Sequence, residues 1–247
     1  MSLPELSLAQ AVRQQYALTM RTLGLSFYRN LIWLEILFSL PILWFSTTTG
    51  TFINNLYHLR VRYLSGSQTL WVAIVYAAAI AWVMADDRQR NVAFTFVTNR
   101  LSHNLSNLAA LMTMSAIAAV LGTLSMILTR VTVTLVGNSI VFAEGYQLTP
   151  PDLFYCLTAV FGYSLLAAVI VYSLVIVLRR KTRLLALIPL VMLLGLKVPL
   201  ADEALGDILT FYIAESSPLL FLLKTVLTAL ALFAAACWGS KGLEVRR

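Results

Sequence analysis

The sequence predicts an all-α polytopic membrane protein with an N-terminal amphipathic interfacial helix, six transmembrane helices and a short re-entrant or interfacial segment before the last span. Two observations lead to this prediction: six apolar stretches, and positive charge that falls mainly on one side of them. The composition agrees, since 60% of the residues are hydrophobic, only 12% are charged and the mean hydropathy is +0.82. About 20 apolar helical residues cross the roughly 30 Å core of a bilayer. The predicted spans are residues 31–53, 69–85, 105–128, 153–178, 184–196 and 218–238.

Positive residues in the short loops predict the orientation of these spans, because Lys and Arg near helix ends resist translocation. An even number of spans places both termini on one face. Of the 18 Lys and Arg residues, thirteen fall on that face and four on the other, while Lys224 lies inside the last span. Both termini are therefore predicted to be cytoplasmic. We attribute the net charge of +7 to this topology, and we expect no nucleic-acid partner.

The first thirty residues contain a predicted amphipathic helix whose apolar residues recur at spacings of three and four. These residues are Leu8, Val12, Tyr16, Met20, Leu23 and Phe27. A helix of this kind lies in the headgroup plane with its apolar stripe toward the lipid. Residues 1–30 are therefore predicted to form a cytoplasmic connecting helix, residues 31–240 the transmembrane domain and residues 241–247 a cytoplasmic tail.

The local structure of two further stretches is less regular. Residues 131–136 alternate as VTVTLV, which fits either a brief strand or the end of a long third helix. Residues 184–196 are short for a span and contain Pro189 and Gly195, and acidic and apolar residues mix in the segment that follows. This combination is typical of a re-entrant or interfacial helix, which is tolerated where protein or a water-filled cavity covers it.

Two ionisable residues fall inside predicted spans, and such residues are functional-site candidates by default. At about 1.5 Å per residue, Glu35 lies ~6 Å from the inner edge of the core and Lys224 lies ~9 Å from the outer edge. The ~15 Å left between them along the membrane normal is too long for a salt bridge. Glu35 could instead meet a cytoplasmic Arg, and Lys224 could extend outward to the headgroups. The candidate pathway residues are Glu35, Tyr76 and Lys224.

The cytoplasmic loop between the second and third spans has charged ends around an apolar centre. It reads DDRQRNVAFTFVTNRLSHN over residues 86–104. Exposed phenylalanines on a short helix are costly unless something covers them. Either the membrane surface or a cytoplasmic partner protein would do so. The next cytoplasmic loop, RRKTR over residues 179–183, is a basic cluster of the kind that keeps a loop inside.

The sequence contains no motif for hydrolysing ATP or binding a metal. It has neither a GxxxxGK[ST] loop for phosphates nor an HExxH pair for zinc. Cys156 and Cys237 fall at opposite depths of the predicted membrane domain, so no disulfide is expected. We expect no catalytic residue and no metal site, and transport through these spans would need an external source of energy.

Over nearly its whole length the chain resembles the membrane (permease) subunit of a type-2 ATP-binding-cassette export transporter. The resemblance rests on the N-terminal helix ending YRN at 28–30, the six spans with a short fifth one, the run RNVAFTFVTNRLSHNLSNLAAL at 90–111, and SSPLLFLL at 216–223. It implies that two permease copies, or one copy and a paralogue, form the substrate pathway in the bacterial cytoplasmic (inner) membrane. It also implies a separate cytoplasmic ATPase that holds ATP and Mg²⁺, while this chain binds no cofactor.

The resemblance further implies which residues contact that ATPase. The coupling segment would use Asp87, Arg88, Arg90, Val92, Phe94, Phe96, Val97 and Arg100, with the two phenylalanines as apolar anchors. A second cytoplasmic contact would use Arg179, Arg180, Lys181 and Arg183. The first, second and fifth spans would line the pathway. Two alternatives remain open: a coupling subunit of an ATPase-driven vitamin importer, and a non-transporting membrane scaffold or immunity protein.

Overall fold

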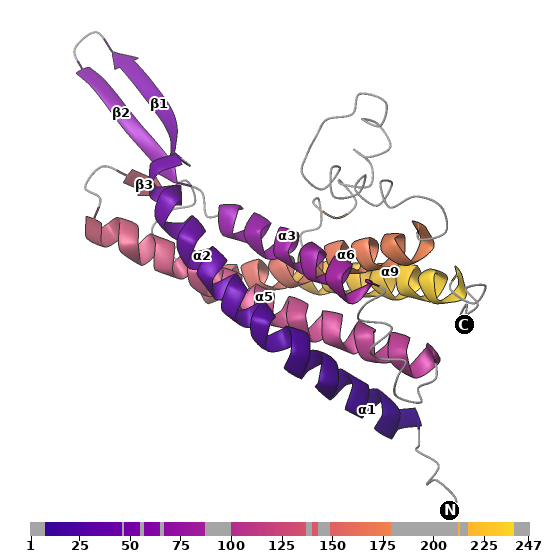
Figure 1. Cartoon of the computed structure of the whole chain (residues 1–247). Helices are drawn as coiled ribbons and strands as arrows, with labels where there is room; N and C mark the ends of the chain where they lie inside the picture. Colours follow the sequence, from indigo (N-terminus) through magenta and orange to yellow (C-terminus); the bar gives the residue numbers. More distant parts are fainter. Residues whose placement is uncertain are drawn as a thin grey trace, which may run out of the picture.

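The structure is a computed structural model that describes residues 8–45, 47–54, 57–64, 67–86, 100–136, 140–142, 149–178, 212 and 217–239. The described helices form an elongated bundle, and a small sheet projects from one end of it (Figure 1). The predicted span 184–196, the basic cluster 179–183 and most of the coupling segment lie outside the described residues. The count of six spans therefore stays a prediction.

The N-terminal part of the chain is one continuous helical rod. It consists of α1 (Leu8–Thr19), the π-helical turn η1 (Met20–Gly24) and α2 (Leu25–Phe45). No break separates the predicted connecting helix from the predicted first span, because Thr19 and Leu25 on either side of η1 both keep helical backbone angles. The predicted helix is present, but its apolar stripe packs on the bundle: Tyr16, Met20 and Leu23 contact the core, and Phe27 is fully buried.

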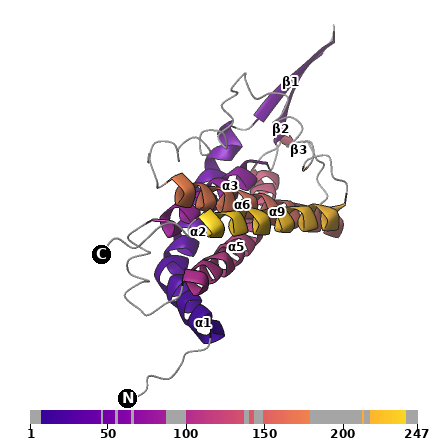
Figure 2. The same ribbon diagram turned by 90° about the vertical axis from the view of Figure 1, so that its right-hand side faces the viewer.

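The predicted first span is too long at its C-terminal end, since α2 stops at Phe45 and the chain continues as a strand. Strand β1 (Thr47–Asn54) pairs antiparallel with β2 (Tyr57–Leu64), and β2 pairs in parallel with β3 (Ile140–Phe142). The β-branched threonines and Gly50 in TTTGT explain the change, because such residues are weak helix formers and the threonines favour strands. The sequence analysis did not predict this sheet, which Figure 2 shows extending beyond the helices.

Four further helices coincide with predicted spans. They are α3 (Ser67–Met84), α5 (Arg100–Val136), α6 (Pro150–Leu178) and α9 (Pro218–Gly239). The VTVTLV stretch is the last part of α5 and is helical. Within the described part, three helical stretches are long and apolar enough to cross a membrane: Ser102–Thr132, Pro150–Ile176 and Pro218–Ala235. The chain is therefore a helical, multi-pass membrane protein.

Helix α6 forms the centre of the bundle and packs against α3, α5 and α9, while α2 packs against α3 and α5. Small residues allow this close approach: α3 turns Ala73, Ala77, Ala78 and Ala81 into the core, each at most 3% exposed. Large apolar side chains cover the outside, among them Trp33 and Leu135, as expected of a surface that faces lipid.

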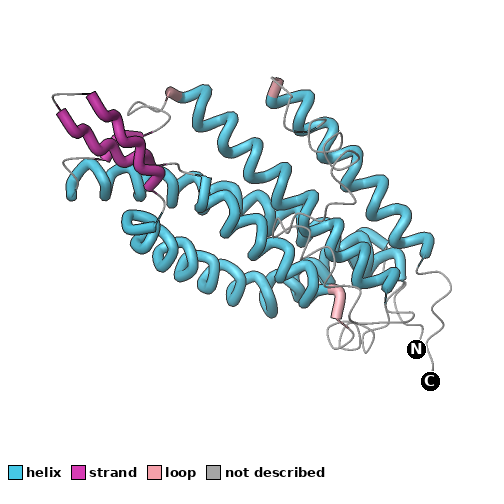
Figure 3. The backbone as a smooth tube through the Cα atoms, turned by 90° about the horizontal axis from the view of Figure 1, so that it is seen from above, coloured by secondary structure: helices cyan, strands magenta, loops and turns pink. Residues whose placement is uncertain are grey.

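The helices run along the bundle, which has two distinct ends, and α6 and α9 run in the same direction. The start of α1 and the end of α9 lie at one end, and the hairpin β1–β2 lies at the other (Figures 1 and 3). The end of α3 and the start of α5 lie at the same end as the start of α1 (Figure 1). The end of α2 and the end of α5 lie at the hairpin end.

Candidate functional site

The most unusual side chain in the described bundle is the carboxylate of Glu35. Glu35 lies on α2 and is only 4% exposed. Both of its carboxyl oxygens are inaccessible to solvent, and neither forms a hydrogen bond with any described residue. Buried polar groups are almost always hydrogen-bonded, and buried charges are almost always paired. This carboxyl group is therefore the strongest candidate for a functional role.

The Glu35 carboxyl lies where four helices meet. A Cβ atom placed on Gly122 of α5 would lie 3.9 Å from Glu35 Oε1, 3.7 Å from Ala73 Cβ on α3 and 3.6 Å from Val160 Cγ1 on α6. The acid therefore lies close to α5, between α2, α3 and α6. Gly122 and Ala73 carry little or no side chain, and the side chain of Val160 is apolar. None of these three residues can donate a side-chain hydrogen bond to the carboxyl.

One hydroxyl group accompanies the carboxyl. Ser125 follows Gly122 by one helical turn on α5, and its side chain lies near Glu35. The Ser125 hydroxyl is itself buried, and no hydrogen-bond partner for it is found among the described residues. The site thus contains a carboxyl group and a hydroxyl group whose hydrogen-bonding capacity is unused in this packing. Neither group meets an Arg there, so the alternative of a Glu35–Arg contact is not seen in the described bundle.

The other two candidate pathway residues lie on different helices. Tyr76 is half-buried on α3, and its ring stacks on Phe27 of α2 with centroids 5.1 Å apart and an interplanar angle of 27°. Tyr76 is one turn from Ala73, so Glu35 and Tyr76 lie along the same α2–α3 contact. Lys224 lies on α9, whose main packing partner is α6. The structure therefore brings Glu35 and Tyr76 to one helix pair and places Lys224 on another helix.

The predicted ATPase contacts fall almost entirely outside the described residues. Arg100 is the exception, since it begins α5, and its backbone is helical. The residues outside are Asp87, Arg88, Arg90, Val92, Phe94, Phe96, Val97, Arg179, Arg180, Lys181 and Arg183. Their roles remain predictions.

The sequence analysis missed a buried polar network near the start of α5. Asn107 Nδ2 donates to the Tyr172 hydroxyl on α6 at 2.9 Å and lies 3.2 Å from His103 Nε2. The Tyr172 ring stacks on Phe233 of α9 with centroids 5.6 Å apart. The network therefore links α5, α6 and α9. An Asn and a Tyr that lie 65 residues apart give no joint signal in the sequence, so only the packing reveals them.

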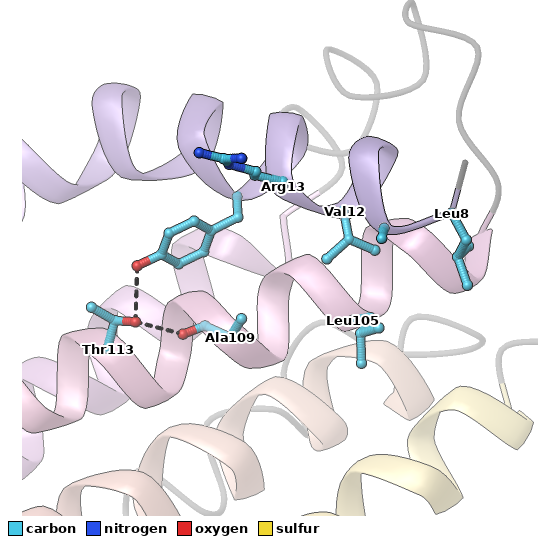
Figure 4. A pocket seen from close by; sticks show the side chains of 8 residues that line it. Leu8, Val12, Arg13, Leu105, Ala109 and Thr113 are labelled. Carbon is cyan, nitrogen blue, oxygen red and sulfur yellow. Dashed lines mark hydrogen bonds between the residues drawn. The ribbon is translucent and has the colours of Figure 1, made fainter. Parts of the chain in front are cut away.

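The cavities between described helices include two whose linings contain no carboxylate, imidazole or thiol. The larger, about 490 Å³, opens between α1 and α5 (Figure 4). Its walls are mainly apolar, with Arg13 of α1 as the one charged lining residue. Tyr16 and Thr113 share a 3.0 Å hydrogen bond that joins the two helices there. This groove can hold an apolar group beside the Arg13 side chain.

The smaller cavity, about 180 Å³, lies between α6 and α9 and is rich in aromatic rings. Tyr163 and Phe221 line it with ring centroids 5.1 Å apart. Tyr212 also lines it, and its hydroxyl donates to Thr228 Oγ1 at 3.1 Å. The close approach of α6 and α9 continues at Gly162, where a Cβ atom would lie 2.5 Å from Phe221 Cε1.

Comparison with known proteins gives no further assignment: no family model, curated protein or solved structure matches this chain. The part of the chain that the structure describes is a multi-pass helical membrane protein in which the acid Glu35 is buried where four helices meet.

Proposed function

We propose that this chain is the transmembrane permease subunit of an ATP-driven exporter. Two copies, or one copy and a paralogue, enclose the substrate pathway in the bacterial inner membrane, with all termini in the cytoplasm. A separate cytoplasmic ATP-binding-cassette ATPase binds ATP and Mg²⁺ and drives the permease through residues 86–104. The chain itself is not an enzyme and binds no cofactor.

The observation that carries the proposal is the position of the two ends of that loop. α3 ends at Met84 and α5 begins at Arg100, and both points lie at the end of the bundle where α1 begins (Figure 1). The hairpin occupies the opposite end. An ATPase on the cytoplasmic face would therefore contact the loop and the N-terminal helix from one side. The basic residues of the predicted inner loops fall on this same side in the predicted topology.

Helix α9 offers an apolar surface to lipid or to a second permease subunit. Helix α9 packs mainly on α6 and exposes an apolar stripe at spacings of three and four: Leu219 is 70% exposed, Leu223 55%, Leu227 57% and Leu230 44%. Exposed apolar stripes of this kind face lipid or another subunit. In the proposed exporter they provide the surface on which lipid or the second permease copy packs.

Affinity purification of the chain from its native membrane in mild detergent, followed by mass spectrometry, tests the proposal. A stoichiometric ATP-binding-cassette ATPase is the expected result. An ATPase whose complex moves its substrate inward would instead identify the importer alternative. Absence of any ATPase, with the chain still folded by circular dichroism, would contradict the proposal and favour a scaffold or immunity protein.

Variants of the coupling segment test whether the ATPase binds at the predicted residues. The double variant F94A/F96A removes the proposed apolar anchors, so we expect it to lower the amount of ATPase that co-purifies without unfolding the bundle. Leu135→Ala is the matched control, because Leu135 is 80% exposed and lies near the end of α5 next to the hairpin. Fully active, intact complexes of the double variant would refute the assigned anchors.

A further inference from the structure

The Glu35 carboxyl group cannot be ionised at low cost in the packing that the structure shows. Both oxygens are buried, and neither forms a hydrogen bond or a salt bridge with a described residue, although the Ser125 hydroxyl lies near them. An isolated carboxylate in an apolar interior is so unfavourable that such a group binds a proton instead. Removing one partner of a buried ion pair is strongly destabilising, and no ion-pair partner for Glu35 is found among the described residues.

Charged and titratable groups on the neighbouring helices lie at other levels of the bundle. α3 carries Tyr76, whose ring stacks on Phe27, eight residues before Glu35. α5 carries Arg100 and His103 at its start and Arg130 near its hairpin end. Arg130 lies about 12 Å along the helix from Gly122 and interacts with Asp152.

The remaining titratable groups near α2 lie on η1, on α2 itself and on α6. η1 carries Arg21, and α2 itself carries Tyr28 and Arg29, both one to two turns before Glu35. On α6, the residue near the site is Val160. The titratable residues of α6 are Asp152, Tyr155, Cys156, Tyr163 and Tyr172. None of these groups forms a hydrogen bond with the Glu35 carboxyl within the described residues.

We propose that Glu35 is a proton-binding site in the membrane core, and that its proton is linked to the packing of α2 on α5. While α2 lies against Gly122 and Ser125, the carboxylic acid keeps its proton and remains neutral. When α2 separates from α5 and water enters, the O–H bond breaks, the proton passes to water and a solvated carboxylate remains. Deprotonation thus favours the separated arrangement, and protonation favours the packed one.

This inference does not depend on the identity of the energy source, so it can fail or succeed independently of the proposed ATPase partner. Its chemistry requires only water and the carboxyl group. Ser125 acts as a positioning residue, because its hydroxyl group can accept a hydrogen bond from the protonated form.

Infrared spectroscopy of the purified full-length chain in lipid nanodiscs tests the inference directly. A protonated carboxylic acid has a C=O stretching band separate from those of carboxylates and amides. At pH about 7 the chain's exposed acids are ionised, since their ordinary pKa values lie near 4. We expect one such band in the wild type, and we expect it to weaken as the pH is raised. Absence of the band at neutral pH would overturn the proposal.

Variants assign the band to its residue. Glu35→Gln is nearly isosteric and neutral, so it should keep the packing and abolish the band. Asp152→Asn is the matched control, because Asp152 is an exposed acid hydrogen-bonded to Thr149, and it should leave the band unchanged. Glu35→Asp keeps an acid at the site and should shift the band, which gives a readout even if the Gln variant folds poorly. A band that persists unchanged in both Glu35 variants would refute the assignment.

Discussion

The contact between α6 and α9 depends on the absence of a side chain at position 162. A Cβ atom on Gly162 would lie 2.5 Å from Phe221 Cε1, 2.9 Å from Phe221 Cζ and 3.3 Å from Thr225 Cγ2. Favourable contacts between carbon atoms occur at about 3.5–4.0 Å. The substitution Gly162→Ala therefore requires the Phe221 ring, or α9 as a whole, to move by about 1 Å.

The cost of this movement follows from what the ring contacts. Phe221 is 7% exposed, and its ring packs on Tyr163 with centroids 5.1 Å apart. Forcing an extra carbon into a packed site costs about 1–3 kcal/mol. Loss of an aromatic pair adds about 0.5–1.5 kcal/mol. The helix propensity of alanine returns up to about 1 kcal/mol. We expect Gly162→Ala to lower the free energy of unfolding by about 2 kcal/mol.

Gly122 provides the matched control on α5. A Cβ atom there would have its nearest neighbours at 3.6, 3.7 and 3.9 Å, which is ordinary van der Waals contact. Gly122→Ala should therefore leave stability within about 1 kcal/mol of the wild type, since its propensity gain faces no large clash. The two variants make the same chemical change inside a helix, so their difference reports the packing alone.

The assay is thermal unfolding of the purified chain in one detergent, followed by tryptophan fluorescence. For a chain of this size, 1 kcal/mol corresponds to about 2–4 °C in Tm. We therefore expect Gly162→Ala to lower Tm by about 4–8 °C relative to Gly122→Ala. Adding Phe221→Leu to Gly162→Ala should relieve part of the clash, so the double variant should lose less than the sum of the single losses. Equal Tm values for the two glycine variants would refute the reasoning.

Two further predictions concern hydrogen bonds between helices. Tyr16→Phe removes the 3.0 Å hydrogen bond to Thr113, so it should destabilise the α1–α5 contact by about 0.5–1.5 kcal/mol. Limited proteolysis should then cut α1 faster than in the wild type. An unchanged cleavage rate would contradict this prediction. Tyr172→Phe deprives the buried Asn107 amide of its acceptor, so it should cost about 1–3 kcal/mol. A Tyr172→Phe variant with wild-type Tm would show that the network does not hold α6 on α5.

The helices were predictable because hydropathy and length are properties of a single segment. The predicted spans 69–85 and 218–238 agree closely with α3 (Ser67–Met84) and α9 (Pro218–Gly239). The end of α2 was placed incorrectly because Phe52 and Ile53 continue the apolar stretch past the point where the helix stops. The threonines and Gly50 before them were the local signal for a strand.

The candidate site could be predicted only in part. The sequence identifies Glu35 as an acid inside a span, but its burial depends on Gly122 of α5 and Ala73 of α3, which are far away along the chain. The depth of a residue in the membrane can be estimated from its position along a predicted span, but this depth does not show which side chains of other helices it contacts. The same holds for His103, which the sequence placed in a loop and the structure places in the first turns of α5.

Photo-crosslinking from residue 94 tests most directly the claim that this chain is driven by a cytoplasmic ATPase. A photoreactive amino acid replaces Phe94 in the native membrane, and the adducts formed on illumination are identified by mass spectrometry. The same amino acid at Leu135 serves as the control from the hairpin end of α5. We expect an ATP-binding-cassette ATPase to be crosslinked from position 94 and none from position 135. Adducts from position 94 that contain only lipid, or proteins without an ATPase domain, would contradict it.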